Sequence, residues 1–130
     1  MGLLANKAGI VTGAGQGIGR AIAIRCAAEG ASIVVADFNR EMGEETVALI
    51  RGAGGEASFA FGDVSDEESV KAMIETVIAV YGRLDIACNS AALSRGSGPI
   101  HEYSREVFDQ TLEMCLTNTW LCMKYEIPAM

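Results

Sequence analysis

The chain has 130 residues, half of them hydrophobic, and a formal net charge of −7. This length supports one hydrophobic core, so we expect a single domain, or part of one, over residues 1–130. The negative charge and the lack of a basic run argue against nucleic acid and acidic membrane surfaces as partners. No apolar stretch is long enough to span a bilayer, and no signal-peptide pattern opens the chain. We therefore expect a soluble, cytoplasmic protein.

The four cysteines, at positions 26, 88, 115 and 122, form no C-x-x-C pair and stand in apolar surroundings. Buried free thiols in a reducing compartment are favoured over disulfides or metal ligands. The single histidine, His101, has no second histidine or suitably spaced acids beside it. We expect it to be a loop residue, and the sequence predicts no metal site.

Strand and helix signals alternate from the N-terminus onward. An apolar, strand-like run over about residues 7–12 precedes a glycine-rich turn and a helix-like run over about residues 17–29. A second apolar run, over about residues 32–37, ends in Asp37. Strand, glycine turn, helix, strand and acid form the layout with which a βαβ unit holds a dinucleotide.

The glycine turn reads T-G-A-G-Q-G-I-G over residues 12–19 and fits the pattern G-x-x-x-G-x-G. Gly13 suits a tight turn, and Gly17 suits a close approach to a pyrophosphate. Gly19 lets the helix lie close on the strand. The helix that follows directs free N–H groups at the phosphates. The predicted cofactor-binding residues of this turn are Gly13, Gly15, Gln16, Gly17, Ile18 and Gly19. A flexible loop that binds nothing is the alternative interpretation.

Asp37 decides the predicted cofactor. A carboxylate at the end of the second strand accepts hydrogen bonds from an adenosine ribose diol and repels a 2′-phosphate. Gln16 adds no positive charge to the turn, although Arg40 stands three residues after Asp37 and would soften the preference. We therefore expect NAD in preference to NADP. The alternative for Asp37 is a solvated turn residue before a helix.

The remaining signals continue the alternation. We expect a helix over about 40–51, a strand over 57–61, a helix from Ser65 to Gly82, a strand over 84–88 and a long helix over about 104–125, before Pro128. Ser65 and Glu68 have the spacing of a capping box, which predicts Ser65 as the N-cap of its helix.

Strands separated by helices predict a doubly wound α/β fold, with a parallel sheet in the order 3-2-1-4 and helices on both faces. A ligand then binds at the carboxyl ends of the strands. After the third strand, Asp63 would accept from the adenine amine and Val64 would pack against the ring. After the fourth strand, Asn89 and Ala91 leave room for a cofactor ribose. A helix-capping acid and a polar turn are the alternatives at these two strand ends.

Together these motifs resemble the N-terminal part of the short-chain dehydrogenase/reductase family. The matching segments are T-G-A-G-Q-G-I-G, Asp37, D-V at 63–64, N-S-A-A at 89–92 and L-C-M-K-Y-E-I-P-A-M at 121–130. The resemblance implies that the glycine turn binds the cofactor, Asp37 holds the adenosine ribose, and Asp63 and Val64 contact adenine. It also implies that Asn89 supports the sheet beside the cofactor. It further implies homo-oligomers built through the last long helix, over about 104–125.

The chain departs from the family pattern in two ways. The family's catalytic Ser and Tyr-x-x-x-Lys lie beyond the segments matched here, so the domain is expected to be incomplete at its C-terminus and inactive alone. Cys115 occupies the position of the family's helix Asn, and a thiol is a poor hydrogen-bonding replacement. Asn118 stands where Gly is usual and is expected to crowd a helix contact. A shifted alignment, with Asn118 as the catalytic residue, breaks the L-C-M-K-Y match.

Three functions follow from these residues. The leading one is the NAD-binding portion of a short-chain oxidoreductase, whose parent enzyme interconverts an alcohol and a ketone by hydride transfer. The second is a non-catalytic nucleotide-sensing or interaction module with the same fold. The third, a methyltransferase-like protein, is disfavoured because Val11 and Thr12, rather than an acid, precede the glycines. In each case the open edge of the fourth strand is expected to favour self-association or a partner chain.

Overall fold

The structure is a computed structural model that describes residues 2–94 and 96–130. It contains β1 (Ala8–Thr12), α1 (Gly17–Ala28), β2 (Ser32–Asp37), α2 (Arg40–Gly52), β3 (Glu56–Phe61), α3 (Glu67–Tyr81) and β4 (Ile86–Asn89). A 3₁₀ turn (Ile100–Glu102) then precedes one long helix, made of α4 (Arg105–Leu112), a π-helical turn (Glu113–Thr117) and α5 (Asn118–Ala129). The expected strands and helices are all present.

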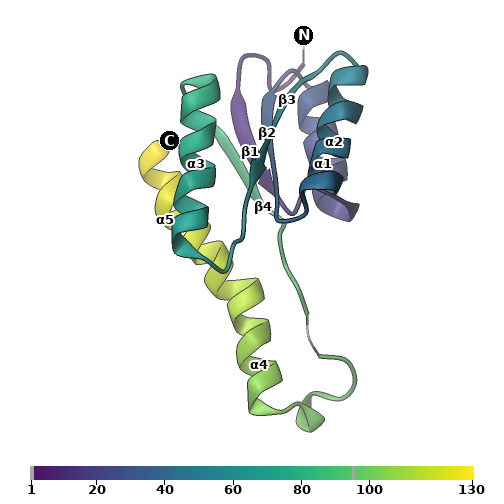
Figure 1. Ribbon diagram of the computed structural model, residues 1–130, viewed down its shortest axis with the longest axis vertical. Coiled ribbons are helices and arrows are strands. Elements are labelled where there is room, and N and C mark those ends of the chain that lie inside the picture. The colour runs from purple at the N-terminus through teal and green to yellow at the C-terminus, as the bar shows by residue number, and fades with distance from the viewer. Residues whose placement is uncertain (1, 95) are drawn as a thin grey trace.

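The four strands form one parallel sheet in the order β3-β2-β1-β4. Helices α1 and α2 cover one face of the sheet, and α3 and α5 cover the other (Figure 1). This confirms the predicted doubly wound α/β fold and its strand order. Strands β3 and β4 are the two edges of the sheet, and every residue of β4 is only half-buried.

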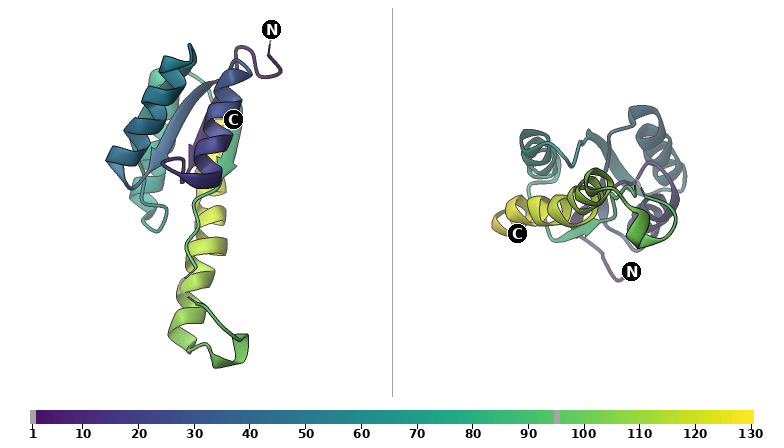
Figure 2. Two further views of the ribbon diagram at one scale, coloured as in Figure 1. Left: turned by 90° about the vertical axis from the view of Figure 1, so that its right-hand side faces the viewer. Right: turned by 90° about the horizontal axis from the view of Figure 1, so that it is seen from below.

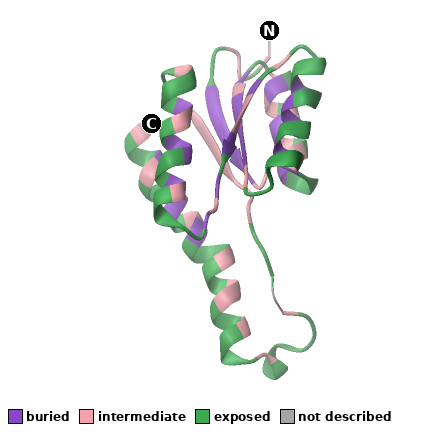
Figure 3. Cartoon of the chain, in the orientation of Figure 1, coloured by how far each residue is buried: buried purple, intermediate pink, exposed green. Residues whose placement is uncertain are grey.

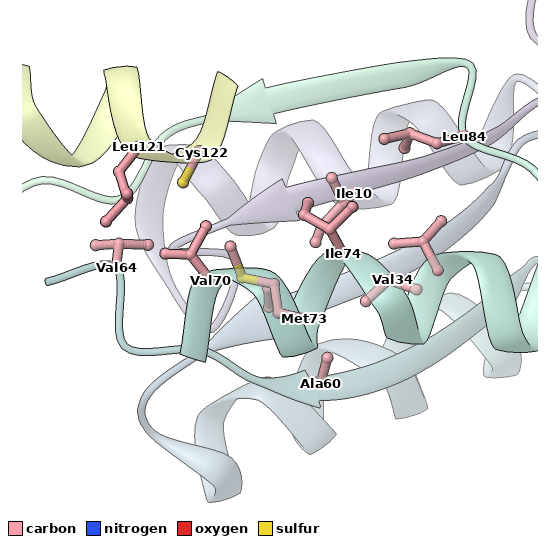
Figure 4. Packing of buried hydrophobic residues seen from close by; sticks show 12 residues of the cluster. Ile10, Val34, Ala60, Val64, Val70, Met73, Ile74, Leu84, Leu121 and Cys122 are labelled. Atoms are coloured by element: carbon pink, nitrogen blue, oxygen red, sulfur yellow. The ribbon is translucent and has the colours of Figure 1, made fainter. Parts of the chain in front are cut away.

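The core lies in two layers because the central strands are covered on both faces. All five residues of β1 are buried, as expected for an apolar run in a parallel sheet. Ile10 and Val34 point toward α3 and α5, where they meet Met73 and Ile74 (Figure 4). Their sequence neighbours Val11, Ile33 and Val35 pack against α1 and α2 instead. The side chains thus alternate between the two layers, as the pleat of a strand requires.

The N-cap of α3 differs from the prediction. Asp66, not Ser65, caps this helix, and its Oδ2 accepts the Ser69 N–H at 2.9 Å. Ser65 instead donates its hydroxyl to Asp63 Oδ1 at 2.6 Å. Ser and Asp are both good N-caps, so the two adjacent residues compete and sequence spacing does not separate them. At the other end, Gly82 ends the helix in the left-handed conformation, as predicted.

The last helix also runs further than expected. It continues past Tyr125 and includes Pro128 in its final turn. A proline so close to a helix end removes one backbone hydrogen bond and leaves the preceding turns intact. In the other direction, α4 projects beyond the sheet (Figures 1 and 2), and none of its residues is buried (Figure 3). Within residues 2–94 and 96–130, no helix is both long and apolar enough to cross a membrane.

Candidate functional site

The carboxyl ends of all four strands meet at one edge of the sheet. Thr12 is in register with Ala36 on one side and with Asn89 on the other, and Asp37 is in register with Phe61. The segments that follow these strands therefore lie next to one another. They carry the residues that the sequence singled out, which are the glycine turn, Asp37, the pair at 63–64 and the segment from Asn89 to Ala91.

The glycine turn after β1 has a shape that side chains would obstruct. Gly13 and Gly17 have φ values of +63° and +57°, which only glycine adopts without strain. A Cβ on Gly13 would lie 2.8 Å from the Cα of Ala91, and a Cβ on Gly19 would lie 2.2 Å from the carbonyl oxygen of Gly13. A Cβ on Gly17 would meet no atom within 4 Å, so this glycine borders open space.

Helix α1 begins directly at this open space. Its N-cap, Gln16, makes no side-chain hydrogen bond to the helix, and no acidic residue stands in the first turn. The first backbone N–H groups of a helix carry partial positive charge and have no partner within the helix. Ile18 beside them is 77% exposed. This end of the helix therefore offers an anion several N–H donors, with no acidic residue in its own first turn.

Asp37 is held against the glycine turn. Its Oδ2 accepts the N–H of Gly15 at 2.8 Å, and its Oδ1 accepts the N–H of Asn39 at 2.9 Å. A Cβ on Gly15 would lie 2.7 Å from Oδ2, so glycine is what allows this contact. Each carboxylate oxygen keeps lone pairs for further donors. The structure thus brings the predicted acid and the predicted turn together.

Two residues that hold the turn were missed by the sequence reasoning. Arg20 Nη2 donates to the Gly15 carbonyl at 2.5 Å, and Arg20 Nε donates to Thr46 Oγ1 at 2.9 Å. The fully buried Thr46 hydroxyl in turn donates to the Ala14 carbonyl at 2.9 Å. A signal existed for Thr46, which interrupts the apolar face of α2. Nothing in the sequence marks Arg20.

Both cations near Asp37 already have partners. Arg20 pairs with Glu45 at 3.1 Å, in addition to its bonds to the turn. Arg40 pairs with Glu44 at 3.1 Å and lies over the Phe59 ring, 4.9 Å from its centroid. Asp37 is therefore held in place, and each of the two bases forms an ion pair with a glutamate.

Of the two predicted residues after β3, Asp63 is partly exposed and Val64 is buried in the core. Asp63 Oδ1 accepts both the N–H and the hydroxyl of Ser65, at 3.0 and 2.6 Å, which leaves Oδ2 free of partners among the described residues. Val64 is only 7% exposed and packs with Val70, Leu121 and Cys122 (Figure 4). Its side chain therefore has little surface left for a ligand.

The residues after β4 are tied to the last helix and to β1. Asn89 Nδ2 donates to Oε2 of Glu126 at 3.0 Å, and the N–H of Ala91 donates to Thr12 Oγ1 at 3.1 Å. Asn89 Oδ1 and Glu126 Oε1 are buried without a partner in the described structure. Burial raises the pKa of Glu126, and the bond from Asn89 opposes this rise. Glu126 was also missed, although it is an acid within an apolar segment.

Cys115 and Asn118 lie at the π-helical turn of the last helix. Cys115 is exposed, with its Sγ 3.9 Å from the Leu93 carbonyl, too long for more than a weak contact. Asn118 is 3% exposed, and its Nδ2 donates to the carbonyls of Ala91 and Met114. From its size we expected Asn118 to crowd the helix contact. It instead supplies hydrogen bonds there.

All four cysteines are free thiols. Only Cys122 is fully buried, and burial together with nearby Glu126 raises its pKa to about 12. Cys26 and Cys88 are half-buried, and burial raises the pKa of each thiol. The expectation of buried thiols is therefore wrong for Cys115. Within residues 2–94 and 96–130, no three His, Cys, Asp or Glu side chains are grouped to hold a metal ion.

Comparison with known proteins places this chain in a family. Residues 13–130 match the family model described as enoyl-(acyl carrier protein) reductase. The chain is 44% identical over its full length to an uncharacterized oxidoreductase, YxbG, of Bacillus subtilis, and 45% identical over 98% of its length to a 2,5-dichloro-2,5-cyclohexadiene-1,4-diol dehydrogenase of Sphingobium indicum.

It spans about half of each of these relatives, 48% and 50% of their lengths. The crystal structure of a hydroxysteroid dehydrogenase from Escherichia coli superposes on 98% of the chain with a TM-score of 0.91 and 32% identity, the match covering 53% of that protein. The chain belongs to the short-chain dehydrogenase/reductase family.

Proposed function

We propose that this chain is the NAD-binding portion of a short-chain oxidoreductase that interconverts an alcohol and a ketone. Members of this family use nicotinamide cofactors. The observation that carries the proposal is the Asp37 carboxylate, held 2.8 Å from the Gly15 N–H at the rim of the glycine turn. This geometry lets one site take both a pyrophosphate and the ribose beside it.

The residues of the site have complementary tasks in this proposal. The turn from Gly13 to Gly19, with Gln16 and Ile18 at its rim, receives the pyrophosphate on the N–H groups that open α1. Asp63 accepts from the adenine amine, and Val64 supports that side from the core. Asn89 and Ala91 border the second ribose. When bound, the nicotinamide donates or accepts the hydride, and the chain's own residues orient it.

The preference for NAD over NADP follows from charge. A 2′-phosphate would have to approach the Asp37 carboxylate, at a strong electrostatic cost. The two bases that would offset this cost, Arg20 and Arg40, are paired with Glu45 and Glu44. Gln16 is neutral, so nothing in the turn attracts the extra phosphate.

The test replaces Asp37 by alanine and titrates the folded chain with NADH and with NADPH. Losing hydrogen bonds to a charged group costs about 1.5–3 kcal/mol, so NADH should bind about tenfold or more weakly to Asp37→Ala, with less discrimination against NADPH. Asp109→Ala, an exposed acid on α4, is the matched control and should bind as the parent does. If Asp37→Ala binds both cofactors as the parent does, the assignment is wrong.

A second candidate is a non-catalytic nucleotide-sensing module with the same fold. The exposed Cys115 thiol favours it, since this residue stands where the family has its helix Asn. The two candidates share the cofactor site and differ in whether any hydride transfer occurs. Turnover of an alcohol by the chain, alone or combined with a C-terminal fragment of a relative, would exclude this second candidate.

We further propose that copies of this chain associate through the last long helix, in a cytoplasmic setting. An exposed apolar stripe, made of Phe108, Leu112, Leu116, Trp120, Met123 and Ile127, follows this helix at intervals of three and four residues. The free state of all the cysteines fits a reducing compartment.

A further inference from the structure

The last long helix widens at the point where it passes the cofactor edge of the sheet. Between α4 and α5 the chain makes a π-helical turn, Glu113–Thr117, and α5 begins with Asn118. The backbone N–H of Asn118 reaches back five residues to the Glu113 carbonyl, instead of four residues to Met114. Single wide turns of this kind are frequent at functional sites.

The Asn118 side chain makes the bond that its backbone does not. Its Nδ2 donates to the Met114 carbonyl at 2.6 Å. The second hydrogen on the same nitrogen donates to the Ala91 carbonyl at 2.9 Å. With the residue only 3% exposed, both bonds are shielded from water. One amide group therefore joins the wide turn of the helix to the segment that follows β4.

Ala91, the far partner of this amide, is in contact with the glycine turn. Its N–H donates to Thr12 Oγ1 at 3.1 Å, and its Cα lies 2.8 Å from where a Cβ on Gly13 would stand. Ala91 is thus held from β1 through its N–H and from the last helix through its carbonyl. Any shift of Ala91 therefore changes the packing around Gly13, whose backbone is in the left-handed conformation.

Among the described residues from Glu113 to Thr119, no other side chain makes this link. Cys115 offers only a thiol, 3.9 Å from the Leu93 carbonyl. Thr119 donates its hydroxyl to the Cys115 carbonyl, within the helix itself. Among the described residues of the turn, Asn118 alone gives a strong donor to the loop.

We propose that Asn118 is a positioning residue of the cofactor site, which sets the wide turn of the last helix and through Ala91 fixes the shape of the glycine turn. This inference rests on the proposed function for its effect on NAD. The link between Asn118 and Ala91 is independent of that function.

The test uses Asn118→Leu, which keeps much of the volume and removes both donors. Without these donors the Ala91 carbonyl loses its link to the last helix, so NADH should bind about tenfold more weakly, which corresponds to about 1.4 kcal/mol. Hydrogen exchange at the Ala91 amide should accelerate, with the amides of β2 unchanged. Thr111→Ala is the control, because it removes a hydroxyl bonded to a helix carbonyl in α4, away from the loop. Unchanged NADH affinity together with unchanged Ala91 exchange would overturn the proposal.

A measurement on the unmodified chain covers the case in which Asn118→Leu fails to fold. The two side-chain amide protons of Asn118 should exchange slowly with water, and more slowly still when NADH is bound. Fast exchange of both protons would overturn the proposed link. If NADH does not bind at all, the proposed function fails, while slow exchange at Asn118 would still support its role in holding Ala91.

Discussion

At the scale of single residues, the pairing of Asn89 with Glu126 has a consequence for pH. One hydrogen bond, of 3.0 Å, joins the two side chains, and the other oxygen of each is buried without a partner in the described structure. A protonated Glu126 adds an O–H donor to this pair, in which Asn89 Nδ2 is the donor of the one hydrogen bond observed. Burial, which raises the pKa of Glu126, favours this protonated form.

Among the described residues, no cation lowers the pKa of Glu126 to reverse this preference. The titratable groups that interact with it are the thiols of Cys88 on β4 and Cys122 on α5, and its carboxylate raises the pKa of both. On the neighbouring face of α5, Lys124 is paired with Glu67 of α3. At pH values between the ordinary pKa of glutamate and the raised one, the folded state therefore binds a proton at Glu126 that the unfolded chain has already released.

This linkage predicts the direction of a pH effect. An acid whose pKa is raised by folding stabilises the fold below its ordinary pKa, and that contribution is lost as pH rises through the raised value. Glu126→Gln keeps a donor and an acceptor at all pH values. It should therefore remove this pH dependence and raise the free energy of unfolding at neutral pH by about 1–3 kcal/mol.

Urea unfolding at about pH 5 and about pH 8 would measure the effect. Glu75→Gln, on an exposed position of α3, controls for the change in net charge. A Glu126→Gln variant that is no more stable than Glu75→Gln at neutral pH would contradict the argument.

At this scale, the sequence predicted those candidate site residues that stand in a local pattern. The glycines and Asp37 stand at set distances from strand ends, so their spacing alone predicts them as candidate site residues. Arg20, Thr46 and Asn118 act through contacts with segments far away in the chain, and no local pattern encodes such contacts. Glu126 is visible only as a charge in an apolar run, which does not reveal its partner Asn89.

At the scale of elements, the glycine turn depends on the closeness of α1 to β1. A methyl group on Gly19 would lie 2.2 Å from the Gly13 carbonyl oxygen, so α1 would have to move away from the turn. Gly19→Ala should therefore destabilise the fold by about 1–3 kcal/mol and weaken NADH binding.

Gly52, the last residue of α2, is the matched control, because a Cβ there would meet no atom within 4 Å. Gly52→Ala should be neutral or stabilise the chain by up to about 1 kcal/mol, through helix propensity. Thermal unfolding followed by circular dichroism compares the two variants. Equal melting temperatures for both would show that α1 does not need this close approach.

Element boundaries were predictable where one signal dominates and not where two compete. Gly82 ends α3 as expected, since only glycine takes its left-handed conformation cheaply. The start of the same helix was misplaced because Ser65 and Asp66 are both good caps. The π-helical turn could not be predicted from a local pattern, because Asn118 makes its hydrogen bond to Ala91, 27 residues away in the chain.

At the scale of the whole molecule, the last helix is only partly covered, since none of the residues of α4 is buried. Its lower half projects beyond the sheet (Figure 2), and Leu116 and Trp120 on its apolar stripe are 65% and 58% exposed. This stripe is the surface through which we propose that copies of the chain associate. The alternation of strands and helices predicted the layers correctly, but the extent of the projection depends on tertiary contacts that no periodicity reports.

Leu116→Glu tests the proposed association of copies through this stripe. A charge in the centre of an apolar interface is costly, so the variant should dissociate toward monomers. Sedimentation velocity over a range of concentrations measures the change. Leu3→Glu, at an 89% exposed position near the N-terminus, should sediment as the parent does. A parent chain that is monomeric at every concentration would contradict the proposal.

If the four strand ends form one NAD site, adding NADH should shift the backbone amide signals around that site in a saturable way. The shifts should be largest at Gly13–Gly19, Asp37, Asp63 and Asn89–Ala91, with small changes along α4. Shifts that spare the glycine turn and Asp37, or no saturable shifts from a folded chain, would contradict the proposed NAD site.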